Sequence, residues 1–312
     1  PRFMRTLMEI KRRGGKVVVI NPLKELGLER FKVPSDVRSL LFGTRIADLY
    51  LMPTIGGDIA LLTGIAKVVL ERGGVDEAYV REHTAEFDAY RTVVESAEWA
   101  TIESASGVDR AEIERAAEVY LKSRRTVFAW TMGITHHAHG VENVQAIAAL
   151  ALLRGMVGRS GAGLLPLRGH SNVRGIGSMG VTPTLKKAVF ENLQKHFGVT
   201  LPTSVGLDTM ACMEKAGAGD VDVAVCLGGN LFGSNPDAVA ASRDLGRIGT
   251  LVHLSTTLNT GHCCGLGLAP VSLPVLARDE EPQRTTQEAM VNYVRVSDGG
   301  PARHEGPRSE VE

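Results

Sequence analysis

The sequence is poor in cysteine, in aromatic residues, in net charge and in long apolar runs, and each shortage excludes a class of protein. Four cysteines in 312 residues are too few for a disulfide scaffold, and the absence of CxxC spacing excludes a local zinc or iron–sulfur site. Aromatic residues make up 5% of the chain, too few for an all-β sandwich. Lys and Arg together number 35, as do Asp and Glu, so net charge attracts neither nucleic acid nor an anionic membrane. Arg154 interrupts the longest apolar stretch, 146–157, which stays short of the roughly 18 residues that a membrane span needs. We therefore expect a globular protein of the cytoplasm, with no nucleic-acid partner and no membrane span.

Glycine is in excess, at 35 of 312 residues, or about 11% against roughly 7% in ordinary proteins. Segments of helical and of strand character alternate along the chain. Strands are predicted at 16–20, 126–130, 221–227 and 250–254, and helices at 58–72, 110–123, 140–154, 184–197, 208–216 and 237–245. This alternation predicts an α/β fold.

The glycine-rich segment 155–180 divides the sequence. It shows no sustained periodicity, so we predict one long loop, and loops of this length inside compact chains are usually functional. The first predicted domain is 1–170 and the second is 171–312. The tail after Arg278 is polar and rich in proline and glycine, and we expect it to be irregular.

Two glycine clusters are candidate nucleotide contacts. Gly228, Gly229 and Asn230 follow the predicted strand 221–227, where glycines let backbone N–H groups approach a phosphate. An ordinary strand-to-helix turn explains them equally well. Gly57 and Asp58 begin the helix 58–72, and Asp58 is either a helix cap or a carboxylate that pairs with the N–H edge of a guanine.

Three other sequence patterns are weaker indications of a binding or catalytic site. The histidines at 136, 137 and 139 cluster in a turn and are predicted to line a ligand. Neighbouring turn histidines rarely converge on one metal and no HExxH pattern accompanies them, so we assign no metal ligand in this chain. Arg168 lies before a glycine, where a guanidinium fork suits a small carboxylate, although a surface arginine fits as well. Segment 175–180 matches GxGxxG, but it lacks the preceding strand and the acidic residue about twenty positions on that a nicotinamide site needs.

Long runs of the sequence carry a family resemblance. They are GITHHAHGVENVQAIAALALLRGMVGRSGAGLLPLRGHSNVRG, INPLKELGLERFKVPSDVRSLLFGTRIADLYLMPTIGGDIALLTG and CLGGNLFGSNPDA. The first resembles the signature of molybdopterin oxidoreductases of the formate dehydrogenase alpha-subunit type. The second is similar to the stretch with which such enzymes recognise one guanosine, and the third resembles the loop that holds the other dinucleotide. STTLNTGH and ARDEEPQRTTQEAMVNYVRVSDGG are closest to a formate-dehydrogenase-like subgroup.

The resemblance implies a fold, a cofactor and a set of site residues. The fold is two doubly wound, Rossmann-like α/β domains of the formate dehydrogenase or dimethyl sulfoxide reductase type, the second incomplete. The cofactor is molybdenum on two molybdopterin guanine dinucleotides (the bis-molybdopterin guanine dinucleotide). Arg168 matches the catalytic arginine that orients formate. The implied cofactor-binding residues are Asn21, Gly57, Asp58, Gly133, Thr135, His136, Gly169, His170, Asn172, Gly228, Gly229, Asn230 and Ser255. His136 and His170 stand where the family usually has Gln, and Asn21 and Ser255 where many members have Asp.

The resemblance also implies parts that this sequence does not contain. Family enzymes hold molybdenum through a Cys or selenocysteine upstream of the segment that Pro1 begins, and carry a 4Fe-4S cluster earlier still. We therefore expect the central portion of a larger enzyme, inactive alone, whose parent oxidises a small-molecule substrate such as formate and passes electrons to a partner subunit. Two rivals stay open at this point, a nicotinamide-dependent dehydrogenase that uses 175–180 and a non-catalytic nucleotide-binding module.

Overall fold

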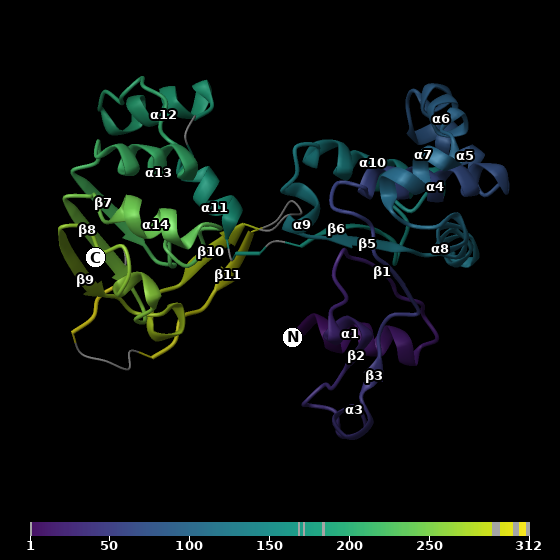
Figure 1. Cartoon of the computed structure of the whole chain (residues 1–312), viewed down its shortest axis with the longest axis horizontal. Coiled ribbons are helices and arrows are strands. Elements are labelled where there is room, and N and C mark those ends of the chain that lie inside the picture. The colour runs from purple at the N-terminus through teal and green to yellow at the C-terminus, as the bar shows by residue number, and fades with distance from the viewer. Residues whose placement is uncertain are drawn as a thin grey trace. The chain divides into compact units, whose positions relative to one another are not determined.

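The structure, a computed structural model, describes residues 2–167, 169–170, 172–182, 185–288, 294–301 and 306–309. The chain divides into two compact units, Pro1–Gly169 and His170–Glu312. Each unit contains both helices and strands, with parallel strands in each (Figure 1), which confirms the α/β prediction.

The first unit holds small parallel sheets among helices. Its elements are α1 (Arg2–Arg12), β1 (Val18–Ile20), α2 (Leu26–Glu29), β2 (Arg30–Phe31), α3 (Val37–Phe42), β3 (Thr44–Arg45), β4 (Leu49–Leu51), α4 (Asp58–Glu71), α5 (Glu77–His83), α6 (Phe87–Ser96), α7 (Trp99–Ser106), α8 (Arg110–Lys122), β5 (Val127–Trp130), α9 (Met132–Thr135), α10 (Gly140–Leu153) and β6 (Gly163–Pro166). Strands β1 and β4 pair in parallel, as do β5 and β6, whereas β2 and β3 are antiparallel.

Helix α4 is the centre of the first unit's core. Leu61 is fully buried on it, and it packs with Ile102 of α7, Ile113 of α8 and Leu150 of α10. Gly64 makes this packing possible, because a Cβ there would lie 2.9 Å from Cγ2 of Ile102. The apolar residues of the predicted helix 58–72 thus lie on the face of α4 that this core buries.

The second unit is built on a three-stranded parallel sheet. Its elements are α11 (Val173–Ser178), α12 (Lys187–Phe197), α13 (Thr209–Ala218), β7 (Val223–Leu227), α14 (Ala238–Leu245), β8 (Thr250–Ser255), the 3-10 turn η1 (Thr260–His262), β9 (Ala269–Pro274), the 3-10 turn η2 (Arg278–Glu280), β10 (Thr285–Glu288) and β11 (Val294–Ser297). The sheet order is β7-β8-β9, and β10 and β11 form an antiparallel pair.

Two segments that were predicted to be irregular contain helices or strands. Segment 155–180 contains β6 and α11 rather than one loop, and the tail after Arg278 contains the β10–β11 pair. Strand β6 forms because its backbone pairs with β5, more than thirty residues earlier, and β10 forms because it pairs with β11. Such pairing overrides a weak local pattern.

The two faces of the β7-β8-β9 sheet differ. One face packs on α13 and α14 through Met213, Ala241 and Leu251. The other carries rows of aliphatic residues that lie side by side across the strands. The rows are Val225–Val252–Val271 and Leu227–Leu254–Leu273. Val225 and Leu227 are each 63% exposed, so we name this surface the open sheet face.

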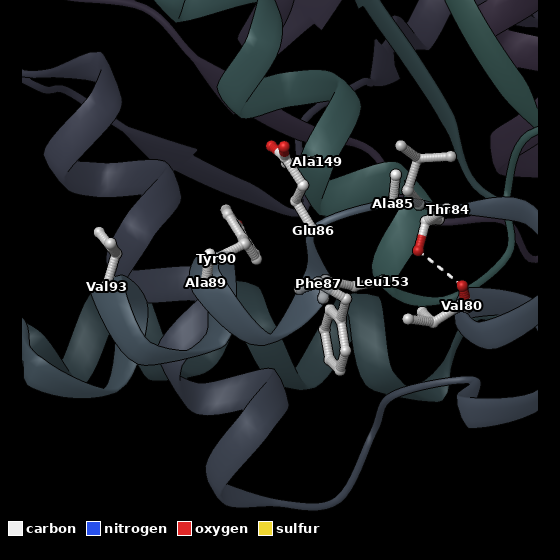
Figure 2. A pocket seen from close by; sticks show the side chains of 11 residues that line it. Val80, Thr84, Ala85, Glu86, Phe87, Ala89, Tyr90, Val93, Ala149 and Leu153 are labelled. Carbon is white, nitrogen blue, oxygen red and sulfur yellow. Dashed lines mark hydrogen bonds between the residues drawn. The ribbon is translucent and has the colours of Figure 1, made fainter.

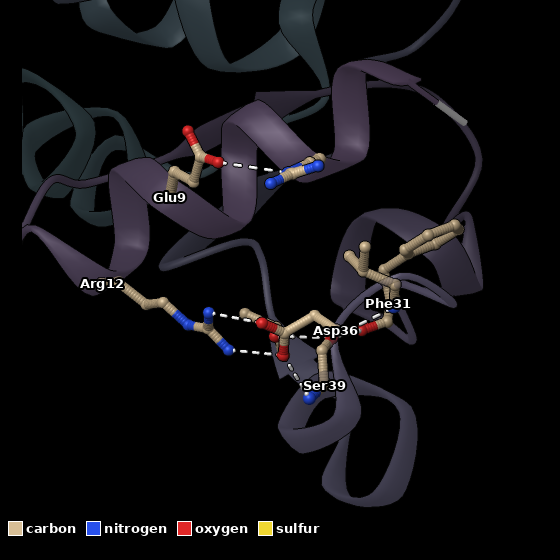
Figure 3. A network of polar contacts seen from close by, with 8 residues as sticks. Glu9, Arg12, Phe31, Asp36 and Ser39 are labelled. Atoms are coloured by element: carbon tan, nitrogen blue, oxygen red, sulfur yellow. Dashed lines mark hydrogen bonds and ion pairs between the residues drawn. The ribbon is translucent and has the colours of Figure 1, made fainter.

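Helix α3 is short but firmly held (Figure 3). Asp36 caps its start and accepts a hydrogen bond of 2.7 Å from the backbone N–H of Ser39. The guanidinium of Arg12 in α1 donates two further hydrogen bonds, of 2.7 and 2.8 Å, to the same carboxylate. The hydroxyl of Ser39 is buried, accepts from the N–H of Val33 at 3.0 Å and lies 3.0 Å from Oγ1 of Thr44. These bonds fix α3 against its surroundings.

Replacing Asp36 with Ala should loosen α3 and leave the core unchanged. The helix loses its cap and its tie to α1, so amide exchange in 37–42 should quicken about fivefold. The hydrogen bonds that the Arg12 side chain and the backbone N–H of Ser39 donate to its carboxylate lower the pKa of Asp36 to about 2. The tie is therefore present above about pH 4 and is lost as the pH falls toward 2. Hydrogen exchange with mass spectrometry measures both effects. Arg5→Ala is the control, since its 3.3 Å pair with Glu9 is exposed, and equal exchange in both variants would contradict the assignment.

Candidate functional site

The ends of β5 and β6 bring together predicted residues of the first unit. The N–H of Leu167, just after β6, donates to the carbonyl of Trp130 at the end of β5, at 2.7 Å. A Cβ at Gly169 would lie 3.2 Å from Sδ of Met132. Gly169 therefore lies against the start of α9, the turn that holds the predicted residues Gly133 and Thr135. Arg168 lies outside the described residues.

The turn from α9 into α10 is closed tightly. A Cβ at Gly140 would lie 2.1 Å from the carbonyl oxygen of Thr135, so the approach requires glycine. A ring nitrogen of His137, Nε2, lies 2.8 Å from the carbonyl oxygen of Gly133. Thr135 also lines a shallow apolar hollow of about 330 Å³ with Val141 and its neighbours in α10. His136 is exposed beside this turn, so its ring is accessible to a ligand.

The ends of β1 and β4 hold the other predicted residues of the first unit. The side-chain amide of Asn21, after β1, donates to the carbonyl of Leu23 at 2.7 Å and to Glu25 at 3.0 Å. Gly57 is the N-cap of α4, and a Cβ there would lie 2.6 Å from the carbonyl oxygen of Ala105. Packing alone therefore explains that glycine. Asp58 is the first residue of α4 and does not cap it; its carboxylate shows no hydrogen bond or ion pair within the described parts of the chain.

In the second unit the loops after β7 and β8 meet at the edge of the sheet. Leu227 pairs with Leu254, which places Gly228 and Ser255 at the ends of neighbouring strands. The side-chain amide of Asn230 donates to Oγ1 of Thr260 at 2.7 Å, and its oxygen accepts from the N–H of Gly233 at 2.8 Å. The predicted residues Gly228, Asn230 and Ser255 therefore form one cluster.

This edge offers free backbone donors. Gly228 and Gly229 have φ of 67° and 69°, a region that favours glycine. The N–H of Gly228 donates to the carbonyl of Leu254, but the N–H groups of Gly229 and Asn230 show no acceptor among the residues that the structure describes. Nothing lies within 4 Å of a Cβ built at Gly229. Open space beside two free N–H groups fits a phosphate oxygen.

Sequence reasoning missed three residues behind this edge. The side chain of Asn259 donates to the carbonyl of Gly229 at 3.1 Å, which joins the two loops. The ring of His262 accepts, at Nδ1, a hydrogen bond of 3.1 Å from the N–H of Asn259, and lies 4.8 Å from the ring of His253. His253 is 8% exposed and its Nε2 has no partner among the described residues; burial, with the neighbouring His262, lowers the pKa of His253. The run STTLNTGH contains two of these residues and was the available signal.

Two other predicted residues begin the second unit. His170 is exposed. Asn172 has a positive φ of 53° and ties α11 to β10: its oxygen accepts from the N–H of Glu288 at 2.9 Å, and its amide donates to the carbonyl of Thr286 at 3.3 Å. Asn172 therefore has a structural role that sequence reasoning did not anticipate.

The GxGxxG segment does not form a dinucleotide fingerprint. Gly175 and Gly177 lie inside α11, not in a turn between a strand and a helix. The geometry thus gives the nicotinamide rival no support. Within the described ranges no group of three or more His, Cys, Asp or Glu side chains is placed to hold a metal ion. Among the same residues no helix has the length and apolarity of a membrane span.

Comparison with known proteins defines the class. The sequence model of molybdopterin oxidoreductases matches residues 2–263, so the chain belongs to the molybdopterin oxidoreductase family. An uncharacterized oxidoreductase of Mycobacterium tuberculosis is 36% identical over 299 residues, which cover 94% of this chain and 38% of the relative. Formate dehydrogenase H of Escherichia coli is 31% identical over 231 residues, covering 71% of this chain and 30% of that enzyme.

A solved structure shows the same fold. Acetylene hydratase from Pelobacter acetylenicus matches with a TM-score of 0.65 at 16% sequence identity, over 97% of this chain and 42% of that protein. The fold class implied by the resemblance is confirmed. The chain spans 38% of the length of the M. tuberculosis relative, so the activity of a whole enzyme is a matter for proposal.

Proposed function

We propose that this chain is the cofactor-binding portion of a cytoplasmic, molybdenum-dependent oxidoreductase whose parent enzyme removes two electrons from a small anionic substrate such as formate. The observation that supports it most is the pair of free N–H groups at Gly229 and Asn230, at the end of a parallel strand, in a chain of the molybdopterin oxidoreductase family. Formate dehydrogenase H is among the relatives, which favours a formate-like substrate.

The residues present fit the two guanine dinucleotides of the cofactor, one at each unit. In the second unit, the edge formed by Gly228, Gly229 and Asn230 would hold the phosphates of one dinucleotide through backbone N–H groups. In the first unit, the carboxylate of Asp58 at the start of α4 is free to accept two N–H bonds from the guanine of the other. Asn259 would keep the two loops of the phosphate edge in register. The remaining predicted cofactor residues are assigned to the walls of the two dinucleotide sites; they are Asn21, Gly57, Gly133, Thr135, His136, Gly169, His170, Asn172 and Ser255.

The chemistry divides between the cofactor and the protein. When bound, the bis-molybdopterin guanine dinucleotide supplies two-electron redox chemistry at molybdenum. Arg168 would hold the substrate carboxylate through its guanidinium fork. The thiolate or selenolate ligand of molybdenum and a 4Fe-4S cluster are assigned to other parts of the parent enzyme, and a partner subunit accepts the electrons. The chain alone is then expected to show no turnover.

Asp58→Ala in the full-length protein tests the cofactor assignment. Loss of a paired carboxylate should weaken guanine binding about tenfold or more, and the molybdenum content of the purified protein should fall accordingly. Elemental analysis measures it. Asp109→Ala is the matched control, because Asp109 also stands at the start of a helix, α8, without a side-chain cap bond. Full molybdenum in the Asp58 variant would contradict the guanine role, and no molybdenum in the unaltered protein would contradict the proposed function itself.

A further inference from the structure

The outer side of α3 is apolar and exposed. Val37 is 74% exposed, Leu41 64% and Phe42 71%, and Leu40 is also exposed. We call these four residues the α3 knob. Val37, Leu40 and Leu41 have the i, i+3, i+4 spacing that places side chains on one face of a helix. The polar residues of the segment, Asp36 and Ser39, face inward and anchor it (Figure 3).

Exposed aliphatic side chains on a rigid anchor are typical of a binding surface. The hydrogen bonds from Arg12 and Ser39 hold α3 in place before any partner arrives, so little further ordering is needed on binding. An apolar patch that has no partner leaves its apolar area in contact with water, which is unfavourable. Exposed apolar patches on folded proteins therefore usually mark interaction sites.

Basic residues surround the knob. Arg38 and Lys32 are exposed and show no ion pair within the described residues. The nearby carboxylates are already paired: Asp36 with Arg12 at 2.7 Å, and Glu29 with Lys24 at 2.8 Å. The partner of the knob should therefore have an apolar groove with an acidic mouth.

Such a groove lies in the same unit (Figure 2). It has a volume of about 390 Å³ between α5, α6 and α10, and we call it the α6 groove. Its walls are apolar and include Val80, Phe87 and Leu153. Volumes of roughly 300 Å³ or more are those of sites that enclose ligand groups, so the groove can take side chains of the size of Leu41 and Phe42.

The mouth of the α6 groove is acidic. Glu86 lines it in a left-handed conformation with φ of 58°, is exposed, and shows no ion pair within the described residues. Asp88, two residues on, is likewise exposed. The cation of α6, Arg91, is already engaged by Glu77 at 2.7 Å and by the ring of Phe87 at 4.5 Å. The charge at the mouth is therefore opposite to that around the knob.

We propose that the α3 knob of one copy of this protein docks in the α6 groove of a second copy, with Arg38 beside Glu86. In Figure 1 α3 and the α5–α6 pair lie at separate ends of the first unit, so within that unit the knob does not fill the groove of its own copy. The contact is heterologous, and repetition builds a ring or an open chain. Four knob residues bury less than the roughly 800 Å² per partner of a standard interface, so the association is weak and depends on concentration.

Charge reversal in the full-length protein tests the pairing. The average mass by sedimentation equilibrium should rise between about 1 and 100 μM. Arg38→Glu and Glu86→Arg should each weaken association about tenfold, and the double variant should restore it. Phe42→Asp should abolish it, while Val205→Asp, an equally exposed position in the second unit, should have no effect.

Other outcomes would overturn the proposal. A constant monomer mass at the highest concentration would show that the knob and the groove do not bind each other. Association that survives Arg38→Glu, Glu86→Arg and Phe42→Asp would come from another surface, such as the open sheet face. A double variant as weak as the two single ones would mean that Arg38 and Glu86 do not meet. Because all four substituted side chains are exposed or at a surface, unchanged circular dichroism should verify that each variant is folded.

Discussion

Arg168→Lys in the full-length enzyme is expected to lower kcat/KM for an anionic substrate, with formate as the first probe, by about one to two orders of magnitude. This corresponds to about 1.4 to 2.8 kcal/mol of transition-state stabilisation. Lysine keeps the positive charge but lacks the planar fork that holds both carboxylate oxygens. Arg168 stands in the sequence between Leu167 and Gly169, which lie at the joined ends of β5 and β6, where a parallel sheet offers its ligand site.

Two comparisons make the Arg168 result specific. The variant should retain full molybdenum, whereas Asp58→Ala should lose it, because one side chain is assigned to the substrate and the other to the guanine. Arg174→Lys, at the next arginine along the chain, is the matched control and should retain activity. Normal turnover in a fully loaded Arg168→Lys enzyme would make this arginine an ordinary loop residue.

Arg154→Met is expected to cause a large loss in the free energy of unfolding. The guanidinium of Arg154, just after α10, donates to the carbonyls of Ser123 at 2.9 Å, Leu121 at 3.0 Å and Gly74 at 3.2 Å, and also to that of Tyr120. Three of these carbonyls end α8, where a helix has acceptors without partners and favours a cation. One side chain thus joins the loop after α4, the end of α8 and the end of α10.

The expected loss in the free energy of unfolding is about 3 kcal/mol, since hydrogen bonds to a charged group contribute roughly 1.5 to 3 kcal/mol each and water replaces some of them. Urea unfolding followed by circular dichroism measures it. Arg159→Met is the matched control: its pair with Asp76, at 3.1 Å, joins side chains that are 39% and 36% exposed, and should contribute less than about 1 kcal/mol. Equal losses in the two variants would show that Arg154 does not join the helices.

Local sequence patterns were enough to predict several elements. The helix predicted at 58–72 is α4, Asp58–Glu71, and the strand predicted at 221–227 contains β7, Val223–Leu227. The helix has the 3.6-residue apolar periodicity of a face that the core buries, and the strand is an apolar run, Val223–Leu227, of the kind typical of a parallel sheet. The family followed from long runs of sequence, and the match over 2–263 confirmed it.

Patterns failed where an element depends on a distant partner. Strand β6 is four residues long within a glycine-rich segment, and it is a strand because β5 pairs with it. The β10–β11 pair lies in a polar tail for the same reason. Helices α5, α6 and α7 were missed because each buries only part of one face against α4 or α10.

The sequence by itself determined the α/β class, the family and the glycines that follow β7, because these depend on residues that are neighbours in the chain. Only the tertiary structure decided that Asn172 binds the backbone of β10, that Asn259 joins the loops after β7 and β8, and that α3 turns its apolar side outward. Asn172 and Glu288 are 116 positions apart, and Asn259 and Gly229 are 30 apart. A hydrogen bond between such residues leaves no periodic trace in the sequence, since its geometry exists only after the strands have paired.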